Sequence, residues 1–157
     1  MPIITPSNAK LLTELSEKST AALTDIIFLY ETVNSLPYKL PLSKLGIIIE
    51  SGSNSNGTWI KFSDGTMICS YYNNSFSCNI TNAALGGYRS TGMSWNFPAQ
   101  FLSGTIPVVI GSGDGNLGIV SAYGKTNTYG VFTFSAVTSQ ETADRVVHLL
   151  AIGRWKE

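Results

Sequence analysis

The chain has 157 residues, 43% of them hydrophobic and only 13% charged, and its ten Lys and Arg balance its ten Asp and Glu to a formal net charge of zero. It has no basic cluster, which argues against nucleic acid as a partner, and no apolar run of about 18 residues, so we expect no membrane insertion. So few charges cannot cover a monomer in the usual way, and we therefore expect much of the surface to lie between subunits.

A seven-residue apolar repeat runs through residues 1–36 and ends before Pro37. Such a repeat is typical of a coiled coil, and proline cannot continue a helix, so we expect a helical stalk over 1–36. The alternative is a single amphipathic helix packed on its own domain. The seam consists of two alternating sets, namely Leu12, Ser19, Ile26 and Val33, and Leu15, Ala22, Leu29 and Leu36.

The apolar stripe of this stalk is wide. Leu11, Leu23 and Tyr30 occupy positions where a two-stranded coil usually carries Glu or Lys. Two neighbouring helices cover such a stripe better than one, so we expect a parallel homotrimer.

Residues 37–57 are expected to form a linker and a loop. Pro37 and Pro41 stiffen the first part, because proline fixes φ and biases the preceding residue toward extended geometry. The stretch 50–57 is rich in Ser, Asn and Gly, a composition typical of a flexible loop. The head domain is then expected over residues 58–157.

Two turn signals open this head domain. Asp64-Gly65 separates apolar stretches at 58–62 and 66–71, and Asp-Gly strongly indicates a hairpin because both residues tolerate positive φ. Asn73-Asn74 indicates a second turn.

The second turn would make the two cysteines neighbours. A two-residue turn at 73–74 places Cys69 opposite Cys78 on paired strands. Directly opposed strand cysteines form a disulfide with difficulty, so we expect two buried free thiols, with a disulfide as the alternative.

Apolar runs of β character recur further along the chain, separated by Gly, Asn, Ser and Thr. Their spacing is that of a small antiparallel sandwich. The expected fold class is thus mainly β, with an N-terminal coiled-coil helix followed by an antiparallel β-sandwich. The runs are 93–97, 106–110, 117–123, 130–137 and 145–152.

The sequence offers little support for catalysis. Residues 113–118 satisfy GxGxxG, but a predicted strand follows them where a phosphate site needs a helix. His148 is the sole imidazole, lies in a predicted strand and has no GxSxG partner motif, which favours a core or interface role over a catalytic one. With no CxxC either, a metal site is not expected, although three copies of His148 on a three-fold axis are an alternative. We expect no enzyme activity and no cofactor.

Four segments together resemble the carboxy-terminal domain of bacteriophage tail fibres. They are NGTWIKFSDGTMIC at 56–69, WNFPA at 95–99, TIPVV at 105–109 and AIGRW at 151–155. The part from about Trp95 is also similar to the H-type lectin sandwich. The resemblance implies a trimeric head on a virion tail fibre that recognises a bacterial surface receptor, either a glycan such as lipopolysaccharide or an outer-membrane protein.

Two loops are expected to share one rim of the head. In an up-and-down antiparallel path alternate loops lie at the same end, so loops 112–116 and 139–144 should be neighbours. The lectin resemblance implies that this rim carries the sugar, and short polar side chains suit hydroxyl recognition. The nominated ligand-binding residues are Asp114, Asn116, Ser139, Gln140 and Glu141.

A second candidate site is the expected turn at 71–74. Its rings can stack on a sugar face and its amides can bind hydroxyls, and the residues are Tyr71, Tyr72, Asn73 and Asn74. The alternative is ordinary cross-strand packing of Tyr71 on Phe76. A third candidate, on the opposite loop, consists of Tyr123, Lys125, Asn127 and Tyr129.

The function that best fits these features is host-receptor binding at the tip of a trimeric phage or phage-like tail fibre, through a surface saccharide. One alternative is a structural trimerisation or capping domain without receptor specificity. A free lectin is another, slightly supported by glycosylation sequons at Asn56, Asn73 and Asn79.

Overall fold

The computed structural model describes residues 26–30, 37–41, 45–113 and 119–157. The chain divides into two units, Met1–Leu42 and Ser43–Glu157. In the first unit, strand β1 (Ile26–Tyr30) pairs antiparallel with β2 (Pro37–Pro41). None of the described residues forms a helix, and so none provides a helix that could cross a membrane.

The expected coiled-coil stalk over residues 1–36 is therefore wrong. Two of its seam residues, Ile26 and Leu29, lie in β1, and Pro37 begins β2 instead of ending a helix. The segment 26–30 reads Ile-Ile-Phe-Leu-Tyr, and β-branched and aromatic residues favour strands over helices. The seam residues outside the described part of the chain are Leu12, Leu15, Ser19, Ala22, Val33 and Leu36.

The second unit contains two five-stranded antiparallel sheets. The first, which we call the long sheet, consists in spatial order of β3 (Ile48–Asn54), β4 (Gly57–Phe62), β5 (Thr66–Ile80), β12 (Gln140–Arg154) and β9 (Val108–Gly113). The second, the short sheet, consists of β10 (Ile119–Gly124), β11 (Tyr129–Ala136), β7 (Gly87–Arg89) and β6 (Asn82–Ala84), with β8 (Met93–Asn96) also paired to β11.

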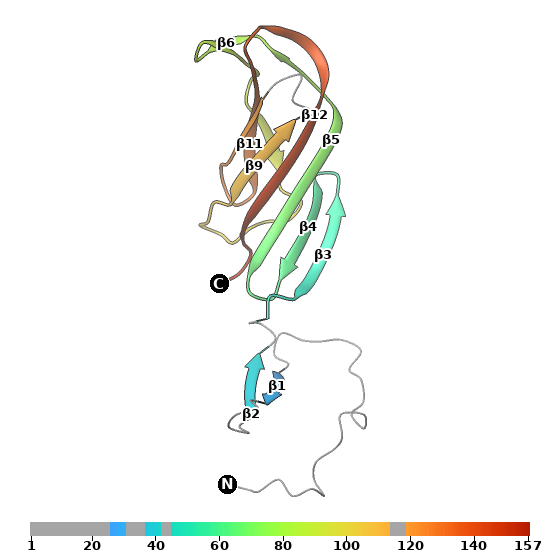
Figure 1. The fold of residues 1–157 in the computed structure, drawn as a ribbon, viewed down its shortest axis with the longest axis vertical. Coiled ribbons are helices and arrows are strands. Elements are labelled where there is room, and N and C mark those ends of the chain that lie inside the picture. The colour runs from blue at the N-terminus through green and yellow to red at the C-terminus, as the bar shows by residue number, and fades with distance from the viewer. Residues whose placement is uncertain (1–25, 31–36, 42–44, 114–118) are drawn as a thin grey trace, which may run out of the picture. The chain divides into compact units, whose positions relative to one another are not determined.

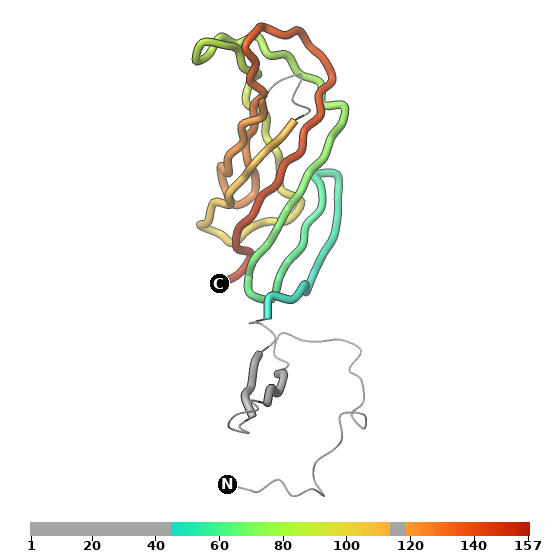
Figure 2. Tube along the Cα trace, in the orientation of Figure 1, coloured from blue at the N-terminus to red at the C-terminus, as the bar shows by residue number. Residues whose placement is uncertain are grey.

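The two longest strands, β5 and β12, form the centre of the long sheet. Each has 15 residues, and they pair from Thr66 with Arg154 to Ile80 with Gln140. Figures 1 and 2 show these two segments, distant in sequence, running side by side. They provide the rigid support on which the outward side chains of the sheet are placed.

The turn expected at Asn73-Asn74 is not formed. Strand β5 continues through it with a register shift, and the Asn73 side-chain oxygen accepts a 2.8 Å hydrogen bond from the Ser75 amide at that irregularity. Cys69 consequently pairs with Ala151 and Cys78 with Ala143. Both cysteines are free, as expected, but only Cys69 is fully buried.

The hairpin expected at Asp64-Gly65 is confirmed. It joins β4 to β5, Gly65 has a φ of +93°, and its amide donates a 3.1 Å hydrogen bond to the Phe62 carbonyl. The loop expected over residues 50–57, in contrast, is mostly strand. Residues 48–62 form a β3–β4 hairpin with Ser55 and Asn56 as its two turn residues, closed by the pair Asn54 and Gly57.

Aromatic side chains from both sheets fill the space between them. Phe76 of the long sheet lies 5.3 Å from Phe132 and 6.4 Å from Phe134 of the short sheet, centroid to centroid. Trp95 contacts Tyr71 of the long sheet and meets Phe97 edge-on at 5.0 Å. This shared core fixes which side of each strand faces outward.

Candidate functional site

A concave site lies on the outer face of the long sheet. Along β12, Val147, Leu149 and Ala151 point into the core, so the alternation of a strand turns His148 outward. His148 pairs with Tyr72 of β5 on one side and with Ser112 of β9 on the other. Register alone therefore brings three distant segments to one level of the sheet.

The rings of Tyr72 and His148 are in contact. Their centroids are 4.6 Å apart with an angle of 38° between planes, and Tyr72 is 58% exposed. The contact holds the tyrosine ring on the sheet while more than half of the residue stays open to solvent. A ring held in this way can contact a ligand with little loss of its own conformational entropy.

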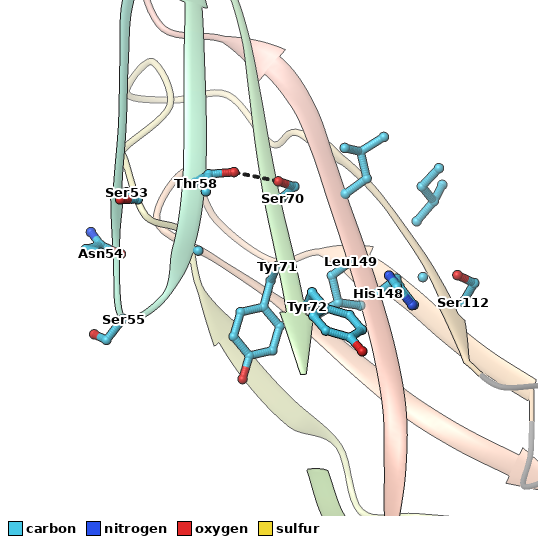
Figure 3. Close-up of a pocket in the computed structure, with 14 residues that line it drawn as sticks. Ser53, Asn54, Ser55, Thr58, Ser70, Tyr71, Tyr72, Ser112, His148 and Leu149 are labelled. Atoms are coloured by element: carbon cyan, nitrogen blue, oxygen red, sulfur yellow. Dashed lines mark hydrogen bonds between the residues drawn. The ribbon is translucent and has the colours of Figure 1, made fainter. Parts of the chain in front are cut away.

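A row of hydroxyls lies next to the rings. Thr58 of β4 pairs with Ser70 of β5, and their hydroxyl oxygens are 2.7 Å apart. Each hydroxyl has one proton and two lone pairs, so the pair keeps hydrogen-bonding capacity for a third group. Figure 3 shows Thr58 and Ser70 beside Tyr72 and His148.

Together these residues line a groove of about 630 Å³, which we call the aromatic groove. Its polar wall comes from Ser53, Asn54, Ser55, Thr58, Ser70 and Ser112. Its aromatic and aliphatic wall comes from Tyr71, Tyr72, Ile110, His148, Leu149 and Leu150. None of the described residues that line it is Asp, Glu, Lys or Arg, so the groove suits a ligand that is uncharged and rich in hydroxyls.

Residues 71–74 lie in the middle of β5 and not at a tip, so they alternate between the two faces. Tyr71 is half-buried, lies 6.2 Å from the Trp95 ring, and accepts a 3.1 Å hydrogen bond from the Asn73 amide. Ring packing of Tyr71 on Phe76 is not among the contacts of the described aromatic residues. Of the four, Tyr72 presents its ring to the groove, and Asn74 is exposed at the irregularity in β5.

The other nominated rim is only partly described, because Asp114 and Asn116 lie outside the described residues. Gln140 begins β12, and its side-chain oxygen accepts a 2.7 Å hydrogen bond from Arg145. The Glu141 carbonyl accepts a second, longer hydrogen bond from the same guanidinium. Arg145 is only 1% exposed and lies over the Phe134 ring, so Gln140 helps to hold a buried cation. Ser139 and the Glu141 side chain are exposed.

Gln140 also borders a second groove, of about 690 Å³, on the short sheet. Ser135 pairs there with both Ile119 and Arg89, and Thr133 pairs with Ser121. This groove carries one formal charge, that of Arg89, among the described residues that line it. We call it the hydroxyl groove.

The third nominated set lies at the β10–β11 turn. Tyr123 is 53% exposed, and Lys125 is also exposed. Asn127 donates a 3.1 Å hydrogen bond to the Phe101 carbonyl and so holds the turn on the core. Tyr129 is half-buried and pairs with Asn96.

Titratable groups with altered pKa values lie away from the walls of the aromatic groove. Burial raises the pKa of the Cys69 thiol to about 11 and raises that of Cys78 as well, so both stay protonated and are poor nucleophiles at neutral pH. The hydrogen bond from Lys61, joined by one from Trp59, lowers the pKa of Glu50. In the described part of the chain, no three His, Cys, Asp or Glu side chains are placed to hold a metal ion.

Sequence reasoning nominated Tyr72 but missed its partners. The Thr58 and Ser70 hydroxyls belong to outward strand positions without a motif, and the sequence around His148 predicts a core or interface residue. The outward orientation of His148 follows from apolar Val147 and Leu149 on either side of it, which is the signal that identifies its face.

No protein-family model matches this chain, and a search of curated proteins gives no match. Among solved structures, the C-terminal part of the R1 pyocin fibre of P. aeruginosa is similar, with 14% sequence identity and a TM-score of 0.45. The similarity covers 96% of this chain and 42% of that one, so the chain spans less than half the length of the fibre fragment. A likeness this distant carries no functional argument, and it does not address the similarity to H-type lectins, which stays a prediction.

Proposed function

We propose that this chain is the receptor-binding head of a trimeric phage or phage-like tail fibre and that it binds a saccharide of the bacterial surface. The observation that carries the proposal is the aromatic groove, an open tyrosine ring beside a row of hydroxyls in a wall without formal charge. The four sequence segments that resemble phage tail fibres support the same assignment.

The chemistry of the groove matches that of a sugar ring. A pyranose has an apolar C–H face and a rim of hydroxyls, and the Tyr72 ring can cover the face while Thr58 and Ser70 exchange hydrogen bonds with the rim. Burying apolar area contributes about 25 cal/mol per Å². A single sugar ring covers little apolar area, so we expect one groove alone to bind a saccharide weakly. Three copies on one fibre would raise the overall affinity through effective concentration.

The proposed function is binding of a saccharide without catalysis of a reaction. The described walls of the groove contain no carboxylate and no cysteine, so they lack the paired acids of a glycosidase and a thiolate nucleophile. We therefore propose that the head holds its receptor and does not cleave it.

The proposal is tested by exposing the purified full chain to an array of bacterial surface polysaccharides and lipopolysaccharides. We expect retention on at least one neutral glycan, and loss of that retention in Tyr72→Ala. Retention that survives Tyr72→Ala would remove the aromatic groove as the site.

A passive trimerisation or capping domain is the second candidate, and the aliphatic surface described below favours it. A passive cap would bind no glycan and no cells while remaining oligomeric. Retention on the array by the oligomer therefore separates the two functions.

A further inference from the structure

The outer face of the long sheet carries a continuous aliphatic row across four strands. Ile60 of β4 pairs with Ile68 of β5, Ile68 with Ile152 of β12, and Ile152 with Val108 of β9. The next level contains the pair Leu150 and Ile110. We call these six residues the aliphatic face.

These side chains are accessible in the single chain. Val108 is 68% exposed and Ile152 is 42% exposed, while Ile60, Ile68 and Leu150 are half-buried. An antiparallel sheet that packs one face on a core normally presents polar side chains on the other. Contiguous aliphatic exposure of this kind marks a surface that another molecule covers.

The charge pattern is compatible with a second copy of the same face. The remaining positions at these two levels are Ser51, Ser53, Thr58 and Ser70, so neither level contains a formal charge. Two copies of the face can meet without like-charge repulsion and without leaving a charge buried and unpaired. The nearest charge on β12, that of Arg154, lies one level beyond the face, opposite Thr66.

We propose that the aliphatic face docks against a second copy of this chain. The low charge of the whole chain, 13% of residues with zero net charge, fits a molecule that shields much of its own surface by self-association. This inference gives the proposed trimer its contact surface and does not depend on which receptor the head binds.

Docking there also affects the aromatic groove. Leu150 and Ile110 belong to the aliphatic face and line the groove as well. A second copy seated on the face therefore lies against one wall of the groove, at the level of the sheet that also holds the Thr58 and Ser70 hydroxyls.

The direct test is thiol protection in the full chain. A Val108→Cys variant places a new thiol on the aliphatic face, and an Ile119→Cys variant places one on the short sheet, where Ile119 is 76% exposed. At concentrations where sedimentation equilibrium gives a mass above 16.9 kDa, we expect maleimide to label the first variant at least tenfold more slowly than the second. Equal labelling in the associated protein, or a wild-type chain that stays monomeric, would overturn the proposal.

A charge substitution provides the second measurement. Ile152→Lys should weaken association at least tenfold, whereas Ile119→Lys should leave it unchanged, and far-UV circular dichroism verifies that both variants fold. Association that withstands Ile152→Lys contradicts the proposal. A protected face together with no glycan retention would remove only the receptor-binding function, and glycan retention by a monomer would remove only the docking surface.

Discussion

The outer faces of the two sheets differ in how their apolar side chains are arranged, although both sheets pack on the same aromatic core. The long sheet presents isoleucines in adjacent register next to Tyr72, whereas apolar and hydroxyl side chains alternate on the short sheet. There the exposed Ile119 and Tyr123 flank Ser121, opposite Ser135, Val131 and Thr133. Inward positions are constrained by folding, so the two sheets resemble each other there. Outward positions are free of that constraint, and on the long sheet their aliphatic side chains form a contiguous row across four strands.

Removing a shared core residue should have the largest effect, because it affects both faces at once. Phe134 is buried and its ring lies against Phe76, Phe132 and Arg145. We expect Phe134→Ala to lower the free energy of unfolding by about 3–5 kcal/mol, as measured by urea denaturation. A loss below about 1 kcal/mol would show that the two sheets do not depend on one core.

A matched pair of glycines tests the two sheets separately. Gly57 borders the aromatic groove at a φ of +127°, and an added Cβ there would collide with the Ser70 carbonyl. Gly86, in the short sheet's β6–β7 turn, has a φ of +78° and open space around it. We expect Gly57→Ala to lower the free energy of unfolding by about 2–3 kcal/mol and Gly86→Ala to lower it by about 1 kcal/mol. Thermal melts that rank the two variants the other way would contradict the backbone geometry of the groove.

A matched pair of threonines sharpens the comparison of the faces. Thr58→Val removes a hydroxyl from the aromatic groove, and Thr133→Val removes one from the hydroxyl groove. A lost hydrogen bond is worth about 1 kcal/mol, so we expect roughly fivefold weaker glycan binding for the first variant and no change for the second. Titration calorimetry with a glycan retained on the array measures both. If both substitutions changed the glycan affinity equally, the aromatic groove would not be the site at which the glycan binds.

The smallest effect concerns an inward position of the long sheet. Because burial raises the pKa of Cys69 to about 11 in the folded chain, the neutral thiol favours folding. Its stabilising effect is complete below the ordinary pKa of about 9 and is lost as the pH rises from there through about 11. The urea midpoint should fall over that range in the wild type, and less steeply in Cys69→Ala. Identical slopes would mean that this thiol is not buried.

Local chemistry predicted the parts of the fold that depend on neighbouring residues. Asp64-Gly65 forms the expected hairpin because a tight turn is decided by its own residues. The Asn73-Asn74 turn failed because β12 pairs with β5 along its whole length, and this long-range ladder outweighs a local turn preference. Residues 26–30 formed a strand for a different reason, since a seven-residue count ignores the β propensity of the residues it passes through.

The candidate site, like the Asn73-Asn74 turn, depends on long-range pairing that local sequence does not predict. Alternation along β12 was enough to place His148 outward, but its contact with Tyr72 depends on the register between strands far apart in the sequence. The register itself is set by the core and by the irregularities in β5 and β12, which no local motif encodes. The aliphatic face was missed for the same reason, because Ile60, Ile68, Ile152 and Val108 become one row only when four strands are aligned.

The central claim is that the long sheet holds the receptor at Tyr72. The most direct measurement is adsorption of labelled full chain to bacterial cells that the wild type binds, comparing Tyr72→Ala with Tyr123→Ala, an exposed tyrosine of the short sheet. The account predicts at least a tenfold loss of adsorption for Tyr72→Ala and wild-type adsorption for Tyr123→Ala. Unchanged adsorption for Tyr72→Ala, or a loss confined to Tyr123→Ala, would contradict it.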